Sequence, residues 1–294
     1  MMTELPLEQV RTLLAVVDEG TFDAAAVALH VTPSAVSQRV KALEQRTGRV
    51  LLQRTKPVRP TESGAVLVRF ARQLARLERD ARGELGMSGA GEPTRVSVAV
   101  NADSLATWFL GALTQVPGLC YELHREDEDH TAALLREGLV MAAVTSSPDP
   151  VPGCSVRALG RMRYLPVAAP EFARRHLNGP LPQVLPEAPV VVFDRKDDFQ
   201  DGFVRRLGRG AASPLRHHVP TSEGFADAVA AGLGWGMVPE FQAGPLLRAG
   251  RLALLDPQEW SDVTLHWQQW KLDSPALAAL ADAVSATAER ALRQ

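Results

Sequence analysis

The sequence has little cysteine and no long apolar run, and each absence excludes a class of protein. Only two cysteines, Cys120 and Cys154, occur among the 294 residues, and neither belongs to a Cys-x-x-Cys or Cys/His cluster. We therefore expect reduced structural thiols rather than a disulfide or a zinc site. Every apolar run stops well short of the roughly eighteen residues that span a membrane, and MMTELPLEQV lacks the basic-then-apolar order of a signal peptide. These features predict a cytoplasmic protein with no membrane partner.

Signatures of catalysis are missing as well. The sequence contains no GxSxG, HExxH or P-loop motif, and GLGWG at 232–236 lies between a predicted helix and a predicted strand, the wrong order for a dinucleotide fingerprint. His217 and His218 are adjacent, so their side chains diverge in a strand, and nothing nearby completes a metal site. We predict that the chain is not an enzyme and requires no cofactor or metal.

Charge is nearly balanced over the whole chain, with a net value of −2, but it is distributed unevenly. Between residues 31 and 66 there are seven basic residues against two acidic ones, which is the pattern expected where phosphates are neutralised. By contrast, residues 126–129 have the acidic sequence EDED. One basic and one acidic region predict two different partners.

Three helices are predicted in the first 44 residues. The first begins at Leu7 and ends at Gly20, the second is FDAAAVAL (22–29), and the third is TPSAVSQRVKALE (32–44). Thr32 can cap the third helix, and Pro33 suits its first turn because the missing N–H has no intrahelical partner there. Two short helices joined by three residues, the second of them basic, indicate a helix-turn-helix.

A basic wing and a long helix are predicted next. RTKPVRP at 54–60 is held extended by its two prolines. A helix follows, capped by Thr61 or Ser63, and its apolar residues form a heptad-like seam that requires a partner helix. That partner is either the same helix of a second copy, which would give a two-fold dimer, or a neighbour in the same domain. The seam consists of Leu67, Phe70, Leu74, Leu77 and Ala81. MSGAGEP at 87–93 is predicted to be a linker.

Beyond this linker, strand and helix patterns alternate, which predicts an α/β fold with parallel strands. Several of the predicted strands are apolar throughout, as in a sheet covered on both faces. About two hundred residues of this pattern favour two lobes, and we expect the last helix, from Ser274, to pack back on the first. The predicted strands are 95–100, 121–124, 139–144, 165–169, 189–193 and 235–239, and the clearest helices are 104–116, 130–138 and 222–232.

This order of parts resembles the LysR-type transcriptional regulators. The matching stretches are FDAAAVALHVTPSAVSQRVKALEQRTG and LLQRTKPVRPTESG. The sequence is most similar to the ArgP and LysG branch, which controls export of arginine and lysine, through LLQRTKPVRPTESG, AVNADSLATW (99–108), PVVVFD (189–194) and TSEGF (221–225).

The resemblance implies a multi-domain protein in three parts. Residues 1–60 would be an all-α winged helix-turn-helix DNA-binding domain, and residues 61–92 a dimerising linker helix and hinge. Residues 93–294 would be an α/β, two-lobed effector domain like a periplasmic binding protein. Its first lobe would comprise 93–163 with 264–294, and its second 164–263.

On the DNA side, the third helix would lie in the major groove and the wing would contact phosphate or the minor groove. Gln38 has the shape for paired hydrogen bonds to adenine. The alternative for each residue is a solvated polar surface. The predicted DNA-contacting residues are Thr32, Pro33, Ser34, Ser37, Gln38, Arg39, Lys41, Arg54, Lys56 and Arg59.

On the effector side, ligands of open α/β sheets bind beyond the carboxyl ends of strands. The Ser104 hydroxyl and the N–H groups of its helix would hold an α-carboxylate, while Asp103 would take an ammonium or a basic side chain. Trp108 is either a core residue or the floor of the cleft, and Glu126 and Asp127 are either ligand contacts or a solvated acidic run. The predicted effector-contacting residues are Asn101, Asp103, Ser104, Trp108, Glu126, Thr145, Ser146, Asp194, Ser222 and Glu223.

The implied partners are promoter DNA, a basic amino acid, and further copies of the chain in a dimer or tetramer, with RNA polymerase as an additional candidate. Two alternatives stay open: a LysR-type regulator with another small-molecule effector, and a solute-binding module without DNA function. The sequence leaves open which of lysine, arginine and histidine is sensed, and whether the protein is an activator or a repressor.

Overall fold

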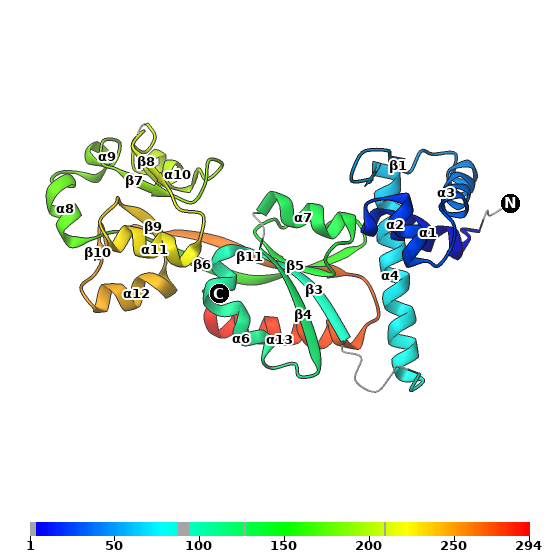
Figure 1. Cartoon of the computed structure of the whole chain (residues 1–294). Coiled ribbons are helices and arrows are strands. Elements are labelled where there is room, and N and C mark those ends of the chain that lie inside the picture. The colour runs from blue at the N-terminus through cyan, green and yellow to red at the C-terminus, as the bar shows by residue number, and fades with distance from the viewer. Residues whose placement is uncertain (1–3, 88–93, 126–127, 209) are drawn as a thin grey trace.

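The computed structural model describes residues 4–87, 94–125, 128–208 and 210–294. A helical N-terminal unit, a central lobe and a distal lobe lie in a row (Figure 1). The linker predicted at 87–93 falls outside the described residues except for Met87.

The N-terminal unit is a winged helix-turn-helix. Its elements are α1 (Leu7–Glu19), α2 (Phe22–Ala28), α3 (Pro33–Thr47), β1 (Leu52–Gln53), β2 (Arg59–Pro60) and α4 (Glu62–Glu84). Gly20 ends α1 in the left-handed conformation with φ 72°. The Thr32 hydroxyl accepts the Ala35 N–H at 3.2 Å, and the Thr61 hydroxyl accepts the Gly64 N–H at 3.0 Å. The three predicted helices and the cap by Thr32 are therefore confirmed.

The long helix α4 buries a different face from the predicted seam. Its buried residues are Gly64, Val68, Ala71 and Arg76. Phe70 and Leu77 of the seam remain 37% and 41% exposed within the single chain. The spacing thus predicted the helix correctly, but the seam is divided: Leu67 packs against the N-terminal core, whereas Phe70 and Leu77 remain exposed.

The α/β part is built on a mixed seven-stranded sheet with the order β10-β6-β11-β5-β3-β4, in which β9 also pairs with β6. The strands β3 (Thr94–Val100), β4 (Leu119–Arg125) and β5 (Ala142–Thr145) are parallel, as predicted. The predicted parallel pairing does not extend to the two long strands that join the lobes, because these are antiparallel. These are β6 (Cys154–Ala168) and β11 (Ser261–Trp270).

The remaining elements cover these strands or complete the distal lobe. A π-helical turn, η1, interrupts the helix predicted at 104–116. Around the central lobe lie α5 (Ala102–Ser104), η1 (Leu105–Phe109), α6 (Leu110–Leu113), α7 (Glu128–Glu137) and α13 (Pro275–Ala291). The distal lobe contains α8 (Pro170–His176), α9 (Leu181–Val184), β7 (Val190–Val192), α10 (Phe199–Leu207), β8 (Arg216–His218), α11 (Ser222–Ala230), β9 (Gly236–Pro239), α12 (Glu240–Arg248) and β10 (Ala253–Leu254).

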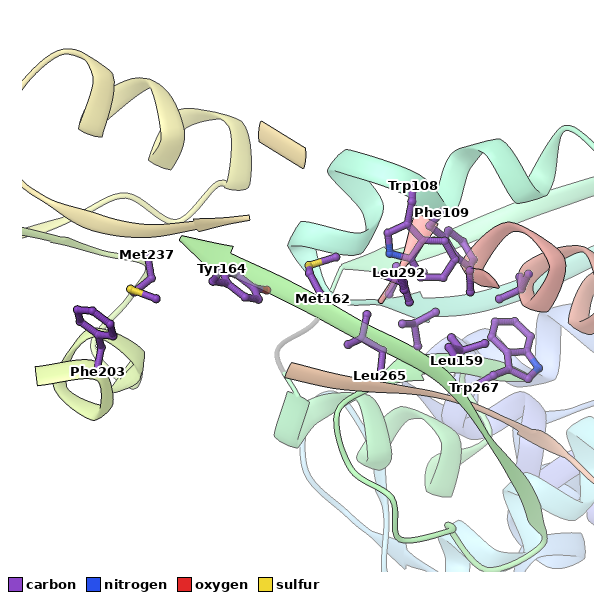
Figure 2. Packing of buried hydrophobic residues seen from close by; sticks show 14 of the residues in the cluster. Trp108, Phe109, Leu159, Met162, Tyr164, Phe203, Met237, Leu265, Trp267 and Leu292 are labelled. Carbon is purple, nitrogen blue, oxygen red and sulfur yellow. The ribbon is translucent and has the colours of Figure 1, made fainter. Parts of the chain in front are cut away.

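One buried apolar cluster extends through both lobes along β6 (Figure 2). In the central lobe Phe109 stacks on Trp267, with ring centroids 6.5 Å apart. Tyr164 lies further along β6, toward Phe203 and Met237 of the distal lobe. Both cysteines are free thiols, and burial raises the pKa of Cys154 to about 11. Among the described residues, no helix is long and apolar enough to cross a membrane.

Arginines of α4 connect the N-terminal unit to the central lobe. Arg72 forms an ion pair with Asp18 of α1 at 2.5 Å and donates to the Glu137 carbonyl oxygen at the end of α7 at 2.8 Å. Arg76, only 1% exposed, pairs with Asp80 and donates to the Arg95 carbonyl oxygen at 2.9 Å. These bonds fix α4 against the central lobe of the same chain.

Candidate DNA-contacting surface and effector pocket

The helix α3 divides cleanly into a packed face and a free face. Val36, Val40 and Leu43 are buried, as their spacing predicts. The predicted contact residues Ser34, Ser37, Gln38 and Lys41 are all exposed, and so are Thr32 and Pro33 at the start of the helix. Arg39 is less free, because it forms an ion pair with Glu8 of α1 at 2.5 Å.

The predicted wing is the β1–β2 hairpin. Arg54, Lys56 and Arg59 are exposed on it, and the Lys56–Pro57 peptide is cis. The Arg54 guanidinium lies 6.0 Å from the centroid of the Phe22 ring. The wing and α3 together present a basic surface formed by one continuous segment of chain.

A pocket of about 420 Å³ lies between the two lobes. Its described lining includes four carboxylates and a single cationic side chain, which gives it an acidic character. The lining residues are Asn101, Ala102, Asp103, Tyr164, Phe193, Asp194, Lys196, Asp197, Asp198, Phe199, Gln200, Ser222, Phe225, Met237, Pro239 and Val263. Such a pocket suits a small ligand with a positive charge.

Asp103 is held in this lining by two side-chain hydroxyl groups. Ser222 donates to one of its oxygens at 2.6 Å, and Tyr164 donates to the other at 2.7 Å. Burial is the largest influence on this carboxyl and raises its pKa, although the two hydroxyl donors act in the opposite direction. The central lobe supplies Asp103 and the distal lobe supplies Ser222, so these bonds join the lobes across the pocket.

A loop after β7 supplies the other carboxylates. Asp197 accepts the backbone N–H groups of Phe193 at 2.7 Å and Phe199 at 3.0 Å, and burial raises its pKa. Asp194 accepts the N–H groups of Lys196 and Asp197. These side-chain to backbone bonds fold residues 193–199 into a compact turn that directs acidic groups into the pocket.

The pocket brings together only part of the predicted effector set. Asn101, Asp103, Asp194 and Ser222 line it. The other predicted residues lie elsewhere: Ser104 and Trp108 are buried outside the lining, Thr145 accepts the Ser147 N–H at the end of β5, Ser146 follows it, and Glu223 is exposed. Glu126 and Asp127 fall outside the described residues.

Tyr164 and Asp197 line the pocket but were not among the predicted effector-contacting residues. Asp197 belongs to DRKDD, directly after a predicted strand, and this position at a strand end was a usable signal. Tyr164 gave no such signal, because the strand that carries it was predicted to begin only at residue 165.

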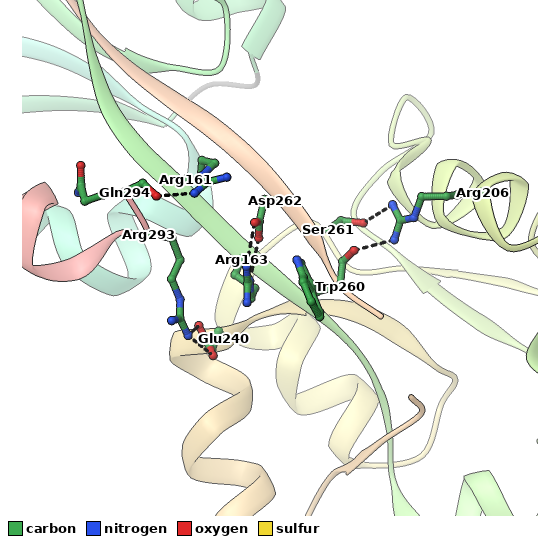
Figure 3. A network of polar contacts seen from close by, with 9 residues as sticks. All are labelled: Arg161, Arg163, Arg206, Glu240, Trp260, Ser261, Asp262, Arg293 and Gln294. Atoms are coloured by element: carbon green, nitrogen blue, oxygen red, sulfur yellow. Dashed lines mark hydrogen bonds and ion pairs between the residues drawn. The ribbon is translucent and has the colours of Figure 1, made fainter. Parts of the chain in front are cut away.

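Polar contacts brace the two crossover strands beside the pocket (Figure 3). Arg163 donates to both carboxylate oxygens of Asp262 at 2.9 and 3.0 Å, which lowers the Asp262 pKa. Arg293, after α13, donates to both oxygens of Glu240 at the start of α12 at 2.9 Å. The distal lobe is thereby tied to the end of the chain that packs on the central lobe.

The fold and the pocket define a class of protein, the DNA-binding regulator with its own effector domain. Its features are a winged helix-turn-helix, a long linking helix and a two-lobed domain with a ligand-sized pocket. The comparisons with known proteins agree. A model of the bacterial regulatory helix-turn-helix protein, lysR family, matches residues 7–65, and a model of the LysR substrate binding domain matches residues 90–289.

The chain therefore belongs to the LysR family of bacterial transcriptional regulators, and the resemblance to the ArgP and LysG branch is confirmed. It is 44% identical over 293 residues to the lysine export transcriptional regulatory protein LysG of Corynebacterium glutamicum, covering 97% of this chain and 98% of that protein. Because members of this family are regulators, the prediction that the chain is not an enzyme is also confirmed.

Two solved structures share the whole fold. The crystal structure of ArgP from Mycobacterium tuberculosis has a TM-score of 0.92 at 49% identity, covering 97% of this chain and 98% of that one. Full-length LysG from Corynebacterium glutamicum with bound effector Arg has a TM-score of 0.86 at 42% identity, covering 98% of this chain and 100% of that one.

Proposed function

We propose that this regulator senses a basic amino acid, lysine or arginine, and controls a gene for its export. The observation that carries the proposal is the acidic interlobe pocket, in which four carboxylates stand against one described cation, Lys196. Two relatives support it: one is named for lysine export, and the structure of one holds Arg.

The chemistry of the pocket favours a cationic side chain for a physical reason. A buried carboxylate such as Asp103 is costly to keep ionised without a partner, and a ligand ammonium or guanidinium supplies one. Asp194, Asp197 and Asp198 add negative potential around it. Lys196 is the candidate partner for the ligand α-carboxylate, since it is the cation among the described lining residues.

On the DNA side we propose that α3 contacts bases in the major groove and that the wing contacts phosphates. The exposed side chains of Ser37 and Gln38 support the first role, and the exposed Arg54, Lys56 and Arg59 support the second. The exposed Phe70 and Leu77 support a dimer formed through α4. We also propose that the protein forms a tetramer, contacts RNA polymerase and is located in the cytoplasm. The domain boundaries at residues 60 and 92 are part of this proposal.

Calorimetric titration of the full chain tests the effector. We expect binding of L-lysine or L-arginine and none of the neutral analogues L-norleucine and L-citrulline, because L-norleucine lacks the terminal ammonium of lysine and L-citrulline has a neutral group in place of the guanidinium of arginine. Silence of L-lysine, L-arginine and L-histidine alike would refute the proposal, and binding of a neutral analogue with equal affinity would indicate a different effector.

A gel shift at several salt concentrations tests the DNA function. A LysR-type regulator should bind its promoter with an affinity that falls steeply as salt rises. A chain that binds the amino acid but no DNA at low salt would instead be a solute-binding module.

A further inference from the structure

The side chain of Gln242 contacts the pocket only indirectly. It lies in the first turn of α12, just after Pro239 of the lining, and is not itself a lining residue. Its amide N–H donates to the Ser222 hydroxyl oxygen at 3.0 Å. Ser222 in turn donates to Asp103 at 2.6 Å. Gln242 therefore contacts Asp103, the central carboxylate of the pocket, only through Ser222.

The direction of these bonds matters because a serine hydroxyl has one proton and can rotate. When the Gln242 amide donates to the Ser222 oxygen, the Ser222 proton is left to point at Asp103. Tyr164 needs no such help, because its hydroxyl already reaches the second oxygen of Asp103 from β6 at 2.7 Å. The orientation of the Ser222 hydroxyl thus depends on its neighbour in α12.

We propose that Gln242 is a positioning residue for effector binding: it turns the Ser222 hydroxyl toward Asp103 and so holds that carboxylate ready for a cationic ligand. This inference rests on the proposed function. It extends the binding site to a residue outside the pocket lining, and it assigns α12 a part in recognition.

The proposal has a consequence for pH. Asp103 is surrounded by groups that disfavour its charge, namely Asp197 on the loop after β7 and Glu223 on α11, in addition to its burial. Asp194, Asp198 and Lys196 also line the pocket. Because the Ser222 and Tyr164 bonds counteract these effects, losing the Ser222 bond should raise the pKa of Asp103 further. Effector binding should then fail at a higher pH than in the wild type.

The test is titration of the full chain with L-arginine from pH 5 to pH 8. Gln242→Leu should weaken binding by about three- to tenfold, as expected for one hydrogen bond to a charged group's partner, and should shift the pH profile upward. Gln115→Leu is the matched control, because the Gln115 amide donates to the Thr287 hydroxyl at 2.8 Å, outside the pocket lining. Gln242→Met replaces the leucine variant if thermal melting shows that the latter is unfolded.

A double-mutant cycle separates positioning from general damage. In a Ser222→Ala background Gln242→Leu should cause no further loss, because there is no hydroxyl left to orient. Equal effects of Gln242→Leu and Gln115→Leu, an unshifted pH profile, or additive losses in the cycle would each overturn the proposal. If the wild type binds no basic amino acid, the proposed function itself fails, and this inference with it.

Discussion

The two candidate binding regions differ in how the chain builds them. The face of α3 proposed to contact DNA comes from one helix, and its side chains are exposed within a few residues of one another. The effector pocket gathers its lining from separate stretches between residues 101 and 263, on both lobes. In the first region each side chain is exposed to solvent before it binds its partner. In the second region Asp103 is already desolvated and accepts hydrogen bonds from Ser222 and Tyr164. Single substitutions should therefore act more strongly in the pocket.

The largest effect is expected from Asp103→Asn. The substitution keeps the shape and removes the charge, so a cationic ligand loses its buried partner, and the dissociation constant for L-arginine should rise by about a hundredfold. Calorimetry measures this change, and a gel shift should give an unaltered operator affinity. Asp194→Asn should act in the same direction and less strongly, since Asp194 also holds backbone N–H groups of its loop. Unchanged L-arginine affinity in Asp103→Asn would contradict the acidic-pocket mechanism.

The next-largest effect is expected from Gln38→Ala, which should weaken operator binding rather than effector binding. A paired hydrogen bond from a glutamine to adenine discriminates between bases by about 1–3 kcal/mol, so operator affinity should fall by roughly tenfold or more while effector affinity is retained. Competition gel shifts with operator and unrelated DNA measure the loss of specificity. If Gln38→Ala and Lys41→Ala both leave this ratio unchanged, α3 does not contact bases.

The same contrast explains how much could be predicted from the sequence. The free face of α3 was predictable because helical spacing separates Val36 and Val40 from the polar residues. Asn101, Asp103 and Asp194 were predictable because they follow strand ends, where α/β sheets bind ligands.

The parts of the fold and of the site that could not be predicted depend on pairing between segments far apart in the sequence. The strand β6 contains SVRALGRMRY, whose arginines hide its strand pattern, and it pairs with β11 about a hundred residues later. Because the predicted strand began only at residue 165, Tyr164 was not among the predicted effector-contacting residues. Ser104 was predicted in the pocket from its place after a strand, but the broken helix through η1 leaves its side chain in the interior. Phe70 and Leu77 of the α4 seam remain exposed in the single chain, and the partner helix proposed for them would come from a second copy.

A moderate effect on stability should accompany the loss of binding in Asp103→Asn. Burial raises the pKa of Asp103 in the folded protein, so ionising this carboxyl group destabilises the folded state. Its contribution to the free energy of unfolding is therefore fully present below the pKa of the unfolded chain and is lost as pH rises through the folded pKa. Removing the charge should therefore raise the melting temperature at pH 7, by a few degrees, and the gain should shrink toward pH 4. A melting temperature that falls at pH 7 would mean that the bonds from Ser222 and Tyr164 outweigh burial.

The smallest effect, and the one that joins the two regions, is expected at Arg72. Its side chain holds both Asp18 of the DNA-binding unit and the Glu137 carbonyl oxygen of the effector domain. Arg72→Ala should leave each separate affinity within about twofold but reduce the change in operator affinity caused by L-arginine, by an amount of about 0.5–2 kcal/mol in coupling free energy. Gel shifts with and without the effector give this value for both proteins. Arg175→Ala is the control, since Arg175 pairs with Glu171 within α8 of the distal lobe. Coupling that survives in Arg72→Ala as fully as in Arg175→Ala would assign communication between the regions to other contacts, of which the buried Arg76 is the next to test.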